Sequence, residues 1–80
     1  MKRVIYILVE TRDDTDETGR WCYNSQEFAA ATGRNLAGAV QVGNVKNRTE
    51  QMDRVFAELL LKGHSRLGHY DWIIEKAEVD

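Results

Sequence analysis

The densest group of ionisable side chains lies between positions 10 and 17, where five carboxylates and one arginine give a net charge of −4. Carboxylates spread along an exposed loop can pair with the arginines and lysines of a partner and steer its approach. Such contacts orient a complex more than they tighten it, so we expect an aromatic anchor beside them. The predicted partner-binding residues are Asp13, Asp14, Asp16, Glu17 and Trp21. The same acids would also suit a loop that is only solvated.

A second cluster mixes basic and aromatic side chains. Proteins that bind nucleic acid place such side chains on one surface, where phosphates and base rings are held together. The residues of this type are Arg20, Trp21, Tyr23, Lys46 and Arg48. The net charge of −2 argues against them, because nucleic-acid-binding domains are usually basic. Direct binding of nucleic acid is therefore the alternative prediction.

The segment 14–19 begins like a calcium loop, with carboxylates at its first and third positions and glycine at the sixth. The pattern then fails, because the fifth position is Thr18 and the twelfth is Ser25, which cannot supply the bidentate carboxylate. We expect no metal site here.

Nothing in the chain forms a nucleophile motif. Cys22 is the single cysteine, and no residue near it presents it as a nucleophile, so we expect a buried or half-buried thiol. His64 and His69 lie five residues apart in a glycine-containing segment, a spacing that suits neither a helical metal pair nor a zinc knuckle. We predict surface histidines, no enzymatic activity and no cofactor.

Length and composition define the class of protein. Eighty residues with 42% hydrophobic and 30% charged side chains fit one small globular domain, residues 1–80. The longest apolar run, 4–9, is far shorter than the ~20 residues that cross a bilayer, and no secretory signal is evident. We expect a cytoplasmic protein without a membrane partner. Because so small a core is marginal alone, a homodimer is a further expectation.

The first half of the chain predicts two strands, a short helix and a third strand. Residues 2–10 are β-branched and aromatic and predict the central strand of a sheet. An exposed loop over 11–19 precedes a short strand at 20–23. Asn24 and Ser25 can cap a helix of at most two turns that ends at Gly33, followed by a loop at 35–38 and a strand at 39–45.

The second half predicts the main helix, over 49–62. Asn47 and Glu50 resemble a capping box, and Gly63 ends the helix. An apolar stripe follows helical spacing at Met52, Val55, Phe56, Leu59 and Leu60. After a turn at 64–69, residues 70–79 fit either a helix or a strand, and their aromatic and β-branched content favours the strand. The predicted class is α+β, a small antiparallel sheet of three to four strands with one main amphipathic helix packed on one face.

The order of these segments resembles that of small phage-encoded accessory proteins. The resemblance lies in the Lys-Arg-Val-Ile-Tyr-Ile-Leu-Val opening, the polar excursion, the single amphipathic helix and the Tyr-Asp-Trp-Ile-Ile ending. Compact inhibitors of host defences, such as anti-CRISPR proteins, are similar in size and in their acidic patches. The resemblance implies binding without catalysis to a protein partner, such as a nucleic-acid-handling complex whose channel the carboxylates cover. It assigns no role to any particular residue.

Overall fold

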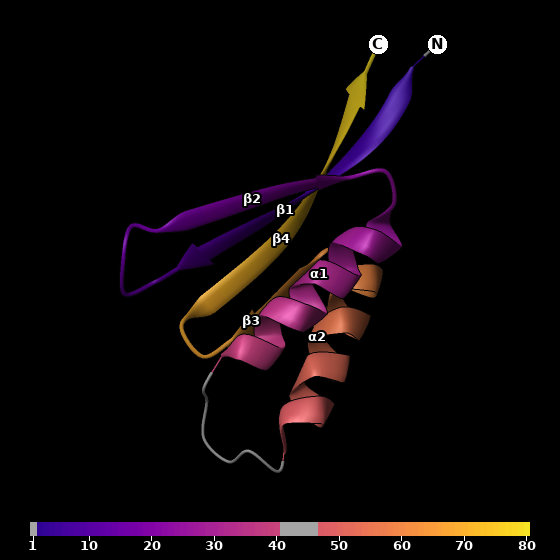
Figure 1. The fold of residues 1–80 in the computed structure, drawn as a ribbon. Helices are drawn as coiled ribbons and strands as arrows, with labels where there is room; N and C mark the ends of the chain where they lie inside the picture. Colours follow the sequence, from indigo (N-terminus) through magenta and orange to yellow (C-terminus); the bar gives the residue numbers. More distant parts are fainter. Residues whose placement is uncertain (1, 41–46) are drawn as a thin grey trace.

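The structure, a computed structural model, describes residues 2–40 and 47–80. Within these ranges the chain forms, in order, two strands, two helices and two further strands (Figure 1). They are β1 (Arg3–Arg12), β2 (Thr18–Tyr23), α1 (Gln26–Ala39), α2 (Arg48–Lys62), β3 (His64–Leu67) and β4 (Tyr70–Val79).

The four strands form one antiparallel sheet in the order β2-β1-β4-β3. The β1 strand is central, as predicted, and pairs with β4 from Arg3↔Val79 to Arg12↔Tyr70. Its pairing with β2 runs from Tyr6↔Tyr23 to Thr11↔Thr18. The strand prediction for 70–79 is therefore confirmed over Tyr70–Val79.

Both helices pack on the same side of the sheet, which we call the helix side (Figure 1). Leu8 and Trp72 point from the sheet into this core, where Val55 and Leu59 of α2 meet them, and all four are fully buried. The predicted stripe of α2 is thus confirmed, with its other members partly buried against the same core. The α+β class is also confirmed, but two helices of similar length replace the single main helix.

The first helix is longer than the sequence suggested. Of the two predicted capping residues, Ser25 caps it, because its Oγ accepts a hydrogen bond of 3.1 Å from the Phe28 amide. The predicted stop at Gly33 and loop at 35–38 are wrong, since α1 continues to Ala39. A Cβ at residue 33 would collide with Leu59 of α2, so this glycine permits a close helix crossing and does not end the helix. Of the predicted strand at 39–45, residue 39 is helical and 41–45 lie outside the described residues.

The ends of α2 agree with the sequence only in part. Gly63 ends the helix in the left-handed conformation at φ 72°, as predicted. Asn47 precedes the first turn, but its side chain makes no capping hydrogen bond, so the predicted capping box is not formed. The predicted turn at 64–69 is wrong over most of its length, because 64–67 form β3 against β4. Ser65 and Leu67 alternate inward there, and the chain turns only at Gly68, where φ is 61°.

The opposite side of the sheet, which we call the open side, is not covered by either described helix (Figure 1). Strand alternation places Ile7 and Ile73 there, and Ile73 is 43% exposed. Cys22 pairs with Ile7 on this side and is exposed, so the predicted burial of its thiol is wrong. Along β2, exposed residues on the open side alternate with half-buried residues on the helix side. No described helix is long and apolar enough to cross a membrane.

Candidate functional site

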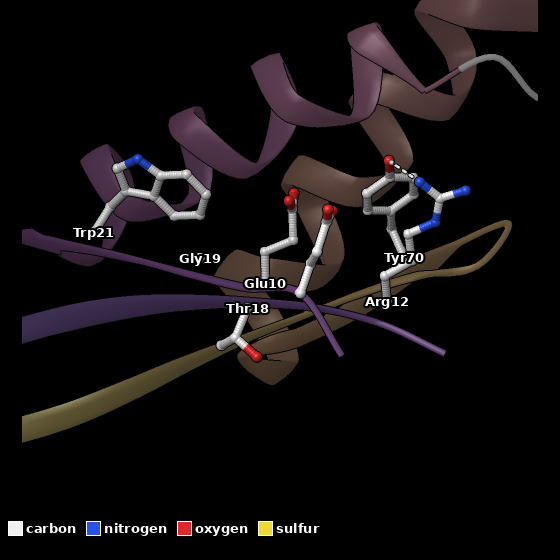
Figure 2. Close-up of a pocket in the computed structure, with 7 residues that line it drawn as sticks. Glu10, Arg12, Thr18, Gly19, Trp21 and Tyr70 are labelled. Atoms are coloured by element: carbon white, nitrogen blue, oxygen red, sulfur yellow. Dashed lines mark hydrogen bonds between the residues drawn. The ribbon is translucent and has the colours of Figure 1, made fainter. Parts of the chain in front are cut away.

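A hollow of about 410 Å³ lies on the helix side, at the end of the sheet where β1 and β2 are joined (Figure 2). Its volume falls in the range of roughly 300–1,000 Å³ that is typical of ligand pockets. All of its lining residues come from β1, β2, β4 and the loop between β1 and β2. They are Glu10, Arg12, Glu17, Thr18, Gly19, Trp21 and Tyr70.

Strand alternation explains why charged side chains reach the helix side here. Leu8 is a core residue, so Glu10 and Arg12, two and four positions later, point to the same side of β1. The register then places Glu10 between Gly19 of β2 and Trp72 of β4. Arg12 lies opposite Tyr70 in the last pair of the β1–β4 ladder.

The Glu10 carboxylate is fixed by a hydrogen bond from a core residue, Trp72. The Nε1 of Trp72 donates a hydrogen bond of 2.7 Å to Oε2 of Glu10, and the Trp72 side chain is fully buried. A buried indole N–H needs an acceptor, so this bond both satisfies Trp72 and fixes the carboxylate. A carboxylate can accept about four hydrogen bonds, so Glu10 keeps acceptor capacity for a ligand. Figure 2 shows its carboxylate lying between Trp21 and Tyr70.

Arg12 is neutralised within the site. Its Nη2 donates to Oδ2 of Asp14 at 3.0 Å, and its Nε lies 2.5 Å from Oδ1 of the same carboxylate. The hydrogen bond from Arg12 lowers the pKa of Asp14, and the bond to Asp14 raises the pKa of Arg12, so the pair stays ionised. The guanidinium also covers Tyr70, with Cζ 5.1 Å from the ring centre and Nη1 donating to the hydroxyl at 3.2 Å.

Trp21 forms a flat wall of the hollow because residue 19 is glycine. A Cβ at residue 19 would lie 2.5 Å from Cη2 of the Trp21 indole, which leans along β2 over this position. Any larger residue would displace the ring. Trp21 is half-buried, so part of it remains available to a ligand.

The structure divides the predicted partner-binding acids into two pairs. Asp13 pairs with two other surface residues, with its Oδ1 2.8 Å from Nδ1 of His69 and its Oδ2 accepting from Arg66. Asp14 pairs with Arg12, so both of these acids hold the loop, residues 13–17, in place. Asp16 and Glu17 are exposed and form no ion pair with any described residue. Of this pair, only Glu17 lines the hollow beside Trp21.

The residues of the alternative prediction are not brought together among the described residues. Arg20 points to the open side, where its guanidinium lies 3.4 Å from Glu75. Trp21 and Tyr23 point to the helix side, and the Tyr23 hydroxyl accepts a hydrogen bond of 2.6 Å from Thr32. Arg48 is exposed at the start of α2, and Lys46 lies outside the described residues.

The sequence reasoning missed Glu10, Arg12 and Tyr70 as site residues. In the prediction from sequence, Glu10 and Arg12 contribute only to the charge of segment 10–17. The available signal was their position two and four residues after Leu8, which places charged groups on the core-facing side of a buried strand.

No protein-family model matches this chain, and no curated protein or solved structure matches it either. Within the described ranges, no group of three or more His, Cys, Asp or Glu side chains is arranged to hold a metal ion.

Proposed function

We propose that this chain is a non-enzymatic protein-interaction module that binds a basic protein surface through the loop end of its sheet. The partner we favour is a nucleic-acid-handling complex of a bacterial host, bound in the cytoplasm in the manner of anti-CRISPR-like phage inhibitors. One observation carries the proposal: Glu10, Asp16 and Glu17 form no ion pair in the described part of the chain and lie at the end of the sheet that presents Trp21.

The loop between β1 and β2 is braced for such a role. The Asp13 amide donates to the carbonyl of His69 at 2.9 Å, while its carboxylate contacts His69 and Arg66. These bonds join the loop to Arg66 of β3 and to His69 in the turn between β3 and β4. A braced loop loses little conformational entropy when it binds, which favours affinity.

The charge distribution supports a basic protein as the partner. Acids that have no ion-pair partner among the described residues attract arginine and lysine side chains and repel phosphates. Surfaces that normally hold phosphates carry those cations, so a nucleic-acid-handling protein is a better match than nucleic acid itself.

The test is capture of partners from a bacterial lysate, with and without nuclease, followed by mass spectrometry. We expect the wild-type chain to retain a protein partner after nuclease. The double substitution Asp16→Asn with Glu17→Gln should reduce its recovery at low salt by at least about tenfold. Glu27→Gln with Glu50→Gln removes two exposed acids from the helices and serves as the charge-matched control.

Two results would contradict the proposal. Equal losses in the two double variants would show that only net charge matters. Recovery of nucleic acid, with every protein partner lost after nuclease treatment, would favour the nucleic-acid-binding alternative.

A further inference from the structure

Three groups of the hollow remain available to a ligand: the carboxylates of Glu10 and Glu17 and the exposed part of Trp21. Neither carboxylate has an ion-pair partner among residues 2–40 and 47–80. Because the charge of Arg12 is offset by Asp14, the field in the hollow is negative. A cation is therefore the favoured ligand, and an anion would face Glu10 directly.

The structure contains its own example of a cation bound at this end of the sheet. The Arg12 guanidinium lies over an aromatic ring, Tyr70, and its nitrogens face a carboxylate, that of Asp14. Trp21 offers a second ring in the same hollow, and Glu10 and Glu17 offer the matching acids. A second guanidinium could thus lie on the indole with its N–H groups directed to these two carboxylates.

We propose that the hollow receives the side chain of one arginine presented by the protein partner. The inference rests on the proposed function for the source of this arginine, whereas the preference for a guanidinium rests on the hollow alone. A guanidinium is flat and carries five N–H donors in a fixed fork, which suits a ring and two separate acids. A lysine ammonium is a compact, strongly hydrated charge and gains less from a flat wall.

The test uses three blocked tripeptides that differ only in the central residue: arginine, lysine or citrulline, the neutral isostere of arginine. Binding is followed by NMR through the separate indole N–H signals of Trp21 and Trp72. We expect the arginine peptide to shift the signals of both Trp21 and Trp72, because the Trp72 N–H donates to Glu10, and to bind at least about tenfold tighter than the citrulline peptide. Equal binding of citrulline would overturn the cation site, and equal binding of lysine would overturn the preference for a guanidinium.

Glu10→Gln supplies the variant arm. Glutamine still offers an oxygen to the Trp72 N–H, so the fold should persist while one negative charge is lost. We expect at least about fivefold weaker binding of the arginine peptide, against no change in Glu27→Gln, an exposed acid of α1. Unchanged binding in Glu10→Gln would contradict the inference, and the peptide comparison on the wild-type chain tests it even if this variant unfolds.

The experiment separates this inference from the proposed function. If the peptides do not bind but lysate capture still depends on Asp16 and Glu17, the inference fails and the proposed function stands. If the arginine peptide binds while no protein is captured, the proposed function fails. Tighter binding of agmatine, a free guanidinium compound, than of the arginine peptide would assign the hollow to a small molecule and overturn the arginine of a partner as its occupant.

Discussion

The helix side of the sheet differs between its middle and its loop end. In the middle, Leu8 and Trp72 are fully buried against the helices. Two residues further along β1, on the same side, stands Glu10, and two further still stands Arg12, whose side chain is 35% exposed. The side of β1 that faces the helices thus changes from apolar at Leu8 to charged at Glu10 and Arg12.

This difference shows that β1 both contributes apolar side chains to the core and holds charged side chains at the hollow. Alternation alone would extend the core by placing apolar residues at positions 10 and 12. A charged group on the core-facing side of a strand must instead be hydrogen-bonded and partly hydrated to avoid a desolvation penalty. Trp72 and Asp14 provide those bonds, so the loop end gives up apolar burial for fixed charges. Departures from local rules of this kind are expected at functional sites.

The largest effect should come from breaking the packed middle. Leu59 is fully buried and contacts both Gly33 and the sheet core, so Leu59→Ala leaves a cavity that a close helix crossing cannot fill. We expect a loss of about 2–5 kcal/mol in the free energy of unfolding, measured by urea denaturation. Glu10→Gln should change it by less than about 1 kcal/mol. Equal losses in the two variants would show that the two regions do not differ as described.

Trp72→Phe should affect both regions, because Trp72 is packed in the core and binds Glu10. The phenylalanine leaves a void and removes the hydrogen bond to Glu10, so we expect a loss of about 1–3 kcal/mol in unfolding free energy. Binding of the arginine peptide should weaken as well, because Glu10 is released. Trp21→Phe is the comparison, with weaker peptide binding and a smaller stability loss. A Trp72→Phe variant with full peptide affinity would show that Glu10 needs no fixing.

Gly19→Ala should affect the hollow alone. The added Cβ must displace the Trp21 indole, so the wall moves while the core does not. We expect weaker binding of the arginine peptide by less than about tenfold, which corresponds to ~1.4 kcal/mol. Gly38→Ala is the control, since its Cβ would meet the flexible Met52 side chain away from the hollow. A Trp21 indole signal that does not move in Gly19→Ala would contradict the role of this glycine.

The smallest effect concerns acid stability at the other edge of the sheet. The hydroxyl of Ser65, with help from Arg54, lowers the pKa of Glu58 from its usual value of 4.5. A carboxylate with a lowered folded-state pKa stabilises the fold above its unfolded-state pKa, and this contribution is lost as pH falls through the folded-state value. The wild-type chain should therefore lose stability below about pH 4.5 more steeply than Glu58→Gln. Parallel pH profiles of unfolding free energy would contradict this.

The parts of the fold that the sequence predicts are those governed by local rules. The strands β1 and β4 follow from β-branched and aromatic residues, and the two ends Ser25 and Gly63 follow from capping chemistry. The length of α1 could not be predicted from local sequence. Gly33 is required by its close contact with Leu59, a residue of another helix, and does not mark a helix end. The strand β3 was missed for the same reason, since its four residues are extended through their pairing with β4.

The candidate site was predictable only in its outline. The acidic loop and Trp21 are evident from composition. That Asp13 is paired while Asp16 is not depends on His69 and Arg66, more than fifty residues from Asp13 in the sequence. Likewise, the juxtaposition of Glu10 with Trp72 depends on the register between β1 and β4, which no local pattern specifies.

The antiparallel pairing of β1 with β4 has a mechanical consequence. Arg3 of β1 and Val79 of β4 are opposite each other at the same end of the ladder (Figure 1). A force that pulls these two residues apart therefore loads the ladder one residue pair at a time. We expect the strands to open as a zipper does, under low tension, without the simultaneous shearing of many hydrogen bonds. Opening starts at the tip farthest from the hollow and reaches the pairs of Glu10 and Arg12 last.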